Sequence, residues 1–344
     1  SDLNGRFEAG RLTEQHISRL SRFDVSLIAG AIRSGEPAVY RQLLGRLVKV
    51  EKFRTPLVLY VTAAAFEQDC PQDAVNYLVE ASRIQQSQGD RGLGLDTCRI
   101  AADAARLAYD LWLRDANNCG QAVEAFENYD AIAGGQMDED IEYRFTAVLD
   151  SCGRGENARA LLKKIAGRAS GKWAIQAKLE LILGDIEQGN LQPDEALLRL
   201  AGLIDDCKGQ ADSQTKTRAL TAYCRLLLER NDQDSLLKIV AATNDPDVGR
   251  AAELLLLRSK ALWKLDRPKE SIDCLLEIIG TKDEQYTAEI IELLAEMVGA
   301  LDKLQCRGDD FDGLLAGAGK VAEYCERIAS SQAGPSAALA QLYL

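Results

Sequence analysis

The residue types that most often do chemistry in proteins are sparse or badly spaced in this chain. Histidine occurs once, at His16, so the usual zinc, haem and catalytic-triad sets lack their parts. The segment 313–320 reads GLLAGAGK, but it lacks the spacing of a phosphate-binding loop and the Ser or Thr that follows its lysine. The aspartate-rich stretch 309–312 lacks the spacing and the final glutamate of a calcium loop. We therefore expect no catalytic residue, no cofactor and no metal site.

The nine cysteines follow no recognisable pattern. Their number is odd and no two form a CxxC pair, unlike the tight spacings typical of zinc sites and disulfide frameworks. Cys224 and Cys274 fall within helical patterns, where a thiol packs as a small apolar group. We expect buried free thiols, which slightly favours a reducing, cytoplasmic compartment. Because the chain begins with Ser1 and not Met, an exported or anchored form that has lost a leader is an open alternative.

Composition indicates a helical, acidic protein. Hydrophobic residues make up 47% of the 344 residues and aromatic residues only 6%, and the abundance of Ala and Leu favours helices over strands. The net charge of -12 repels phosphate backbones and no long Lys/Arg cluster offsets it, so we expect no nucleic-acid partner. The apolar stretch at 57–66 is too short for a membrane span.

A short phrase recurs along the chain: a turn residue, an acid, a small residue and then an apolar run. It reads PQDA at 71–74, PDEA at 193–196 and PKES at 268–271, with weaker copies elsewhere. Successive small residues are separated by 36, 48, 36, 38, 39 and 36 positions, which is typical of stacked copies of one supersecondary unit. The small residues are Ala38, Ala74, Ala122, Ala158, Ala196, Ser235 and Ser271.

Residues 251–279 illustrate the unit. Apolar residues recur at helical spacing through 254–265, and Pro268 then fits the first turn of a second helix. Ser271, and Ser259 twelve residues before it, leave room for the two helices to cross closely. In most copies a large apolar residue follows four positions after the small one, as the buried face of a helix requires. Each unit is therefore predicted to be a helical hairpin.

This pattern resembles the tetratricopeptide repeat, a helix–turn–helix unit of about 34 residues. The resemblance is strongest around Thr62–Ala74–Ala81, Thr146–Ala158 and Ser259–Ser271. It implies an all-α protein, a right-handed α-solenoid of about seven helical hairpins. The array would span 20–283, between an N-terminal capping segment (1–19) and divergent C-terminal capping helices with a tail (284–344).

The repeat pattern is interrupted at several places. Asp110 and Tyr223 stand where a small residue is expected, and the units run longer than those of the family. The excess between positions 74 and 122 is predicted to lie near 85–96, whose polar and glycine-rich sequence is typical of a loop or frayed helix end. A long amphipathic helix is predicted over 286–304 and a last helix over 314–328.

In the family that the chain resembles, the first helix of each hairpin lines a concave groove that binds a peptide or a partner's helix. The mixture of polar and aromatic side chains at the corresponding positions suits peptide recognition. The groove residues predicted on this basis are Phe66, Glu67, Arg114, Tyr143, Asp150, Asp185, Gln188, Lys260, Trp263 and Lys264.

Three functions compete at this point. The first is a non-catalytic scaffold that binds a protein or peptide in the groove. The second is a self-assembling structural array, in which copies of the chain pack on one another as homo-oligomers. The third is an enzyme that uses paired carboxylates in the groove, since carboxylates are abundant. The missing catalytic constellation favours the scaffold.

Overall fold

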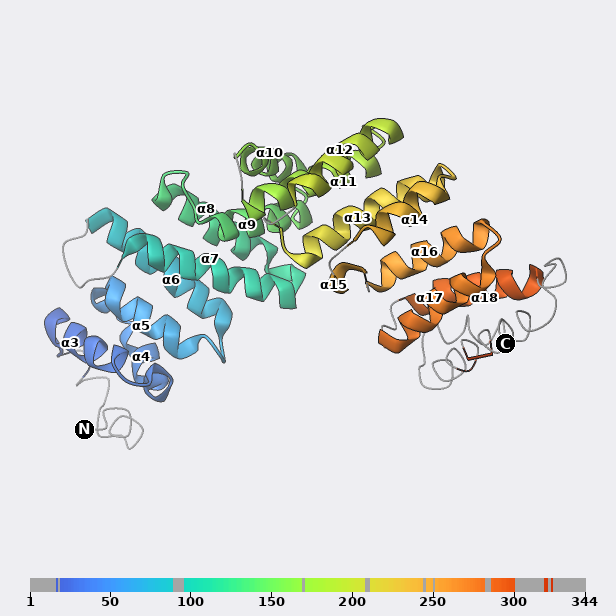
Figure 1. Ribbon diagram of the computed structural model, residues 1–344. Coiled ribbons are helices and arrows are strands. Elements are labelled where there is room, and N and C mark those ends of the chain that lie inside the picture. Colours follow the sequence, from blue (N-terminus) through green and yellow to red (C-terminus); the bar gives the residue numbers. More distant parts are fainter. Residues whose placement is uncertain are drawn as a thin grey trace. The chain divides into compact units, whose positions relative to one another are not determined.

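The described part of the chain is helical throughout in the computed structural model (Figure 1). The structure describes residues 17, 19–88, 96–168, 171–207, 211–243, 246–249, 251–281, 286–300, 319–320 and 323. Consecutive helices pack mainly on their neighbours, as in a helical repeat array. Among these residues, no helix combines the length and apolar character needed to cross a membrane. The chain forms two compact units, 1–165 and 166–344.

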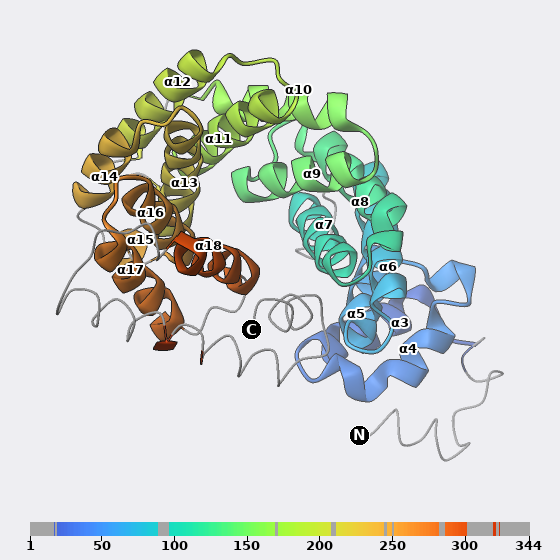
Figure 2. The ribbon, with the colours of Figure 1, turned by 90° about the vertical axis from the view of Figure 1, so that its right-hand side faces the viewer.

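Unit 1 contains one continuous hydrophobic core that runs from Ile17 to Ala158. The closest packing joins the successive helices α5, α6, α7 and α8, and α5, α6 and α7 lie side by side in both views (Figures 1 and 2). The elements are α3 (Arg22–Arg33), the 3-10 turn η1 (Pro37–Tyr40), α4 (Arg41–Leu47), η2 (Glu51–Phe53), α5 (Pro56–Phe66), α6 (Pro71–Gln88), α7 (Thr97–Arg114), η3 (Ala116–Asn118), α8 (Cys119–Ala133), α9 (Glu139–Ser151) and α10 (Gly155–Ala166).

Unit 2 repeats the hairpin arrangement around smaller buried clusters. The predicted hairpin at 251–279 is confirmed, as the helix pair α16–α17. The elements are α11 (Lys172–Glu187), α12 (Pro193–Asp206), α13 (Ser213–Glu229), α14 (Gln233–Ala241), the short α15 (Pro246–Gly249), α16 (Ala252–Lys264), α17 (Pro268–Thr281) and α18 (Thr287–Ala300).

The recurring segments at 71–74, 193–196 and 268–271 begin helices, as the sequence predicts. Pro71, Pro193 and Pro268 each begin a helix, where the fixed φ suits the first turn and the missing N–H costs nothing. An acidic side chain follows in each first turn and favours the positive end of the helix dipole. Between α16 and α17 the chain reverses at Asp266, whose φ of 55° lies in the left-handed region that aspartate tolerates. Local signals therefore place the hairpins.

The small residues of the phrase lie where paired helices meet. Ala74, Ala122, Ala196 and Ser271 have no exposed surface. At the α16–α17 crossing, the Ser259 hydroxyl donates to the Ser271 carbonyl oxygen at 2.9 Å, and the Ser271 hydroxyl donates to the Ser259 carbonyl oxygen at 2.8 Å. Each buried hydroxyl thus has a partner on the facing backbone, which is possible only because both side chains are short.

We expect the space at this crossing to matter more than its hydroxyl groups. The two hydroxyl oxygens also lie 2.8 Å apart, so the double substitution Ser259→Ala/Ser271→Ala removes both hydroxyls together and is expected to change the free energy of unfolding by less than about 1 kcal/mol. Ser271→Leu forces a large side chain into the crossing and is expected to cost about 1–3 kcal/mol. Urea denaturation followed by circular dichroism measures both. A double variant that loses more than Ser271→Leu would show that the hydrogen bonds dominate.

One prediction is wrong. Ala38 is exposed in η1, so no hairpin crosses there. Asp110 departs from the pattern as expected: it is exposed, and α7 instead buries Ala104, Ala105 and Ala108, which supply the small surface toward its neighbours. The first part of the segment 85–96, predicted to be a loop or a frayed helix end, is the end of helix α6, which continues to Gln88, and residues 89–95 lie outside the described residues.

A disulfide overturns the expectation that the cysteines are free. Cys119, the first residue of α8, is bonded to Cys152, the C-cap of α9, with Cα atoms 5.9 Å apart. The two residues are 33 positions apart, so no local spacing pattern announces them. Cys207, Cys224 and Cys274 are buried free thiols, as expected, and burial raises the pKa of Cys224 to about 12.

The terminal predictions are tested in part. The long C-terminal helix is confirmed as α18, Thr287–Ala300, within the expected range 286–304. The segments 1–16, 89–95, 301–318 and 324–344 lie outside the described residues. Most of the predicted N-terminal cap, most of the predicted last helix and the predicted tail belong to these segments.

Candidate partner-binding cavity

A cavity of about 300 Å³ opens in unit 1 between α5, α6 and α7. Its lining combines apolar side chains with charged ones, the mixture typical of ligand pockets, and its volume is at the small end of their range. The lining residues are Tyr60, Ala63, Ala64, Glu67, Leu78, Asp103, Arg106, Leu107 and Asp110.

Helical periodicity explains how the lining is assembled. On α5 and its C-cap the lining residues stand at 60, 63, 64 and 67, and on α7 at 103, 106, 107 and 110. Both sets follow the spacing i, i+3, i+4, i+7, which puts four side chains on one helix face. Because α5 and α7 are the first helices of consecutive hairpins, the two faces look onto one space, and Leu78 of α6 contributes the remaining wall.

The cavity has more negative than positive side chains. Arg106, the one cation among the lining residues, donates to Asp138 Oδ2 at 3.1 Å and lies 3.8 Å from Asp103 Oδ1. Within the described ranges, the carboxylates of Glu67 and Asp110 accept no hydrogen bond and form no ion pair. Burial raises the pKa of Asp103, while Arg99 and Arg106 act in the opposite direction. Two exposed carboxylates and one half-buried carboxylate therefore face a space with a single, already engaged guanidinium.

The flanks of the cavity are held by neighbouring contacts. The Arg33 guanidinium of α3 stacks over the Tyr60 ring, 5.6 Å from its centroid. On the other side of α7, Arg144 of α9 covers the Tyr109 ring at 5.1 Å, and that ring packs against Trp112. These contacts hold α5 and α7 in place beside the cavity.

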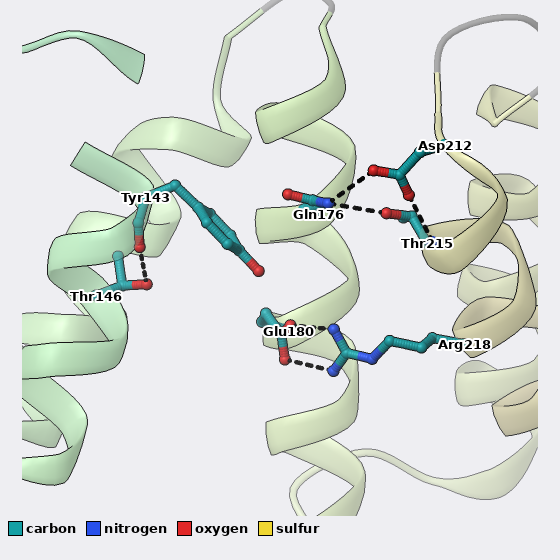
Figure 3. Close-up of polar contacts among 7 residues, drawn as sticks. All are labelled: Tyr143, Thr146, Gln176, Glu180, Asp212, Thr215 and Arg218. Carbon is teal, nitrogen blue, oxygen red and sulfur yellow. Dashed lines mark hydrogen bonds and ion pairs between the residues drawn. The ribbon is translucent and has the colours of Figure 1, made fainter. Parts of the chain in front are cut away.

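Several polar side chains on the first helices of unit 2 are bonded to one another. Figure 3 shows Arg218 of α13 donating two hydrogen bonds to Glu180 of α11, at 2.6 and 3.1 Å. Arg225 of α13 pairs with Glu253 of α16. Trp263 Nε1 donates to Glu296 of α18 at 3.0 Å. Polar side chains of successive first helices are thus bonded to one another here, whereas Glu67 and Asp110 in unit 1 are not.

One of these internal contacts has a strong effect on a titratable group. Asp212, the N-cap of α13, accepts a hydrogen bond from the Thr215 backbone N–H at 2.8 Å and pairs with Lys172 of α11 at 2.9 Å. Figure 3 shows the contact with Thr215, together with a hydrogen bond that Asp212 accepts from the Gln176 side chain of α11. The hydrogen bond from Lys172, with the cap bonds, lowers the pKa of Asp212 to about 2, against the opposing effect of partial burial. The carboxylate therefore couples two consecutive first helices.

We expect the contribution of Asp212 to stability to depend on pH. Its folded-state pKa lies below the unfolded value of about 4, so the stabilisation is complete above pH 4 and is lost as pH falls toward 2. Asp212→Asn keeps a capping side chain but removes the charge. The loss at pH 7 is expected to be about 1 kcal/mol, discounted because a third of the side chain stays exposed.

Urea titrations at pH 7 and pH 2 test this expectation. The difference between Asp212→Asn and the unsubstituted protein should shrink to a small fraction of its pH 7 value at pH 2, where the folded-state carboxylate is about half protonated. Glu277→Gln, an exposed change on α17, serves as the control and should alter stability by less than about 0.5 kcal/mol at either pH. A difference as large at pH 2 as at pH 7 would assign the effect to cap geometry and not to charge.

The predicted groove residues lie in varied settings. Of the ten, Glu67 lines the cavity. Phe66 is half-buried, and its ring packs edge-on against Tyr77 at 5.9 Å. Trp263 is bonded to Glu296, Lys264 to Asn231 and Gln188 to Asn190. Tyr143, Asp185 and Lys260 are half-buried, and Arg114 and Asp150 are exposed. Their role in binding stays a prediction.

Sequence reasoning missed most of the cavity. The family-based positions are counted from a small residue at the crossing, and Asp110 does not occupy that place in α7. The signal that could have found the cavity is the matching i, i+3, i+4, i+7 stripe at 60–67 and 103–110. It is weak in sequence because alanines and charged residues are common on any helix.

Comparison with known proteins adds no assignment. No protein-family model matches the chain, and no curated protein matches its sequence significantly. The cavity and its surroundings therefore stand as the structural basis for assigning a function.

Proposed function

We propose that this chain is a tetratricopeptide-like helical scaffold without catalytic activity, which binds a peptide segment of a partner protein. The binding place is the cavity between α5, α6 and α7. The observation that carries the proposal is a contrast between the two units: first-helix pairs such as Glu180–Arg218 and Trp263–Glu296 bond to one another in unit 2, but Glu67 and Asp110 at the unit 1 cavity have no such partner among the described residues. Unbonded polar groups at a concave, partly apolar surface are available to a ligand.

The dimensions of the cavity support a side chain as its occupant. A volume of about 300 Å³ is small for a drug-sized ligand but ample for one anchoring side chain of a longer segment. Arrays of helical hairpins bind extended peptides in this manner, with a few buried anchors carrying most of the affinity. Leu113, one turn beyond Asp110 on α7, is 60% exposed and offers an apolar contact to the rest of such a segment.

Filling the cavity should abolish binding. Ala64 is an exposed residue of α5 that lines the cavity, so Ala64→Phe occupies the space without entering the core. Peptides are first selected from a random display library on the immobilised unsubstituted chain. Their affinities for the chain and for Ala64→Phe are then measured by fluorescence anisotropy. We expect the substitution to weaken binding by at least tenfold.

A matched control separates occlusion from a general surface effect. Ala241→Phe introduces the same side chain at an exposed position of α14 in unit 2 and should leave the affinities unchanged. Selected peptides that bind Ala64→Phe as tightly as the unsubstituted chain would refute the proposed site. A chain that selects no peptide and sediments as a stable oligomer would favour the self-assembling array in place of the scaffold.

A further inference from the structure

We propose that the cavity between α5, α6 and α7 recognises a basic side chain, lysine or arginine, of the bound peptide. The inference rests on the proposed function and deepens it by naming the chemistry of the anchor. It is carried by two independent properties of the lining, the charge at the mouth and the apolar surface beneath it.

The first property is an excess of negative charge. Glu67, Asp103 and Asp110 line the same space as one cation, Arg106, which lies 3.8 Å from Asp103 Oδ1 and is hydrogen-bonded to Asp138 outside the cavity. The carboxylates of Glu67 and Asp110 have no bonded partner among the described residues. A cationic head group would gain charge-assisted hydrogen bonds here. An anionic group would meet three carboxylates, and like-charge contacts of this kind disfavour a partner strongly.

The second property is the distribution of polar and apolar groups with depth. Ala63 and Leu78 are buried and form the inner wall, whereas Glu67 and Asp110 are exposed and stand at the mouth. A lysine or arginine side chain has the same division, with an aliphatic stem and a charged head. Its stem can cover the inner apolar wall while its head stays among the carboxylates. A short polar side chain would leave that wall bare, and a wholly apolar one would leave the carboxylates without a partner.

Blocked pentapeptides of the form Gly-Ser-Xaa-Ser-Gly provide a defined probe. Xaa is lysine, arginine, norleucine or glutamate, so that norleucine keeps the aliphatic stem and removes the charge. Binding to the purified chain is measured by saturation-transfer NMR titration. We expect the lysine and arginine peptides to bind at least tenfold more tightly than the norleucine peptide, and the glutamate peptide to show no saturation.

Variants locate the site. Asp103→Asn/Asp110→Asn preserves the shape of the side chains and is expected to weaken the lysine peptide at least tenfold and to remove its advantage over norleucine. Glu277→Gln removes one exposed carboxylate from α17 and should leave binding unchanged. Raising the salt concentration should weaken the lysine peptide in the unsubstituted chain and have little effect in the double variant.

Three results would overturn the inference. Equal affinity for lysine and norleucine peptides would mean that charge is not recognised. Undiminished binding of the lysine peptide by the double variant would place the site elsewhere. Binding of spermidine at this site, with no binding of any pentapeptide, would assign it to free polyamines and not to a peptide side chain.

The inference and the proposed function fail in different ways. Library-selected peptides could lose affinity for Ala64→Phe and yet contain no lysine or arginine whose replacement weakens binding. That result would leave the scaffold intact and refute the basic anchor. Selected peptides unaffected by Ala64→Phe would refute the scaffold site itself.

Discussion

Replacing Phe126 by alanine is expected to lower the free energy of unfolding by about 3–5 kcal/mol. Phe126 has no exposed surface, and its ring stacks on Phe145 of α9 with centroids 4.8 Å apart and nearly parallel planes. The side chain therefore belongs both to the α7–α8 hairpin and to its contact with the next one. Truncation leaves a cavity at this junction that the packed helices cannot fill, and urea denaturation monitored by circular dichroism measures the cost.

An exposed apolar residue provides the comparison. Leu113→Ala on α7 removes a similar kind of side chain, but that residue is 60% exposed, so the loss should stay below about 0.5 kcal/mol. If Phe126→Ala were no more destabilising than Leu113→Ala, the α8–α9 junction would not be packed as described.

Removing the Cys119–Cys152 disulfide is expected to lower the stability of the oxidised protein by about 3–4 kcal/mol. The bond closes a loop of 33 residues and restricts the unfolded chain, and a loop of this length predicts a cost of that size. It ties the start of α8 to the end of α9, the same pair of helices that Phe126 and Phe145 join. Cys119→Ala/Cys152→Ala, denatured in urea without reductant, tests the value.

Reductant and a third cysteine supply the controls. With dithiothreitol present, the unsubstituted protein and the double variant should approach the same stability. Cys98→Ala, at an exposed cysteine outside the disulfide in the first turn of α7, should behave as the unsubstituted protein does. Alkylation of both Cys119 and Cys152 in a non-reducing peptide map of the oxidised chain would contradict the bond.

Local signals determined much of the fold before any tertiary contact was known. The prolines at 71, 193 and 268 begin helices because φ is fixed by the residue itself, and the acids beside them act on the dipole of their own helix. Ser259 and Ser271 could be assigned to a crossing because their spacing fits one hairpin. These are interactions within one or two turns, so neighbouring residues suffice to predict them.

Tertiary structure alone decided the features that join different hairpins. The partners Cys119 and Cys152 are far apart in sequence, and nothing near either residue indicates the other. Glu142, in the first turn of α9, is fully buried and pairs with Lys164 of α10 at 2.8 Å. A carboxylate can be placed there only because the next helix brings its ammonium group to it.

The candidate site shows the same difference between features set by local sequence and features set by packing between hairpins. The sequence by itself determined that the chain is helical and repetitive, and its resemblance to a repeat family predicted that first-helix faces bind a partner. It did not determine which face stays open, because that depends on how each helix is rotated about its axis. In unit 1 the buried alanines of α7 turn Asp103 and Asp110 toward α5, whereas in unit 2 Glu180 meets Arg218 and is neutralised. Rotation is set by the packing of neighbouring helices, and a repeat pattern read one unit at a time does not contain it.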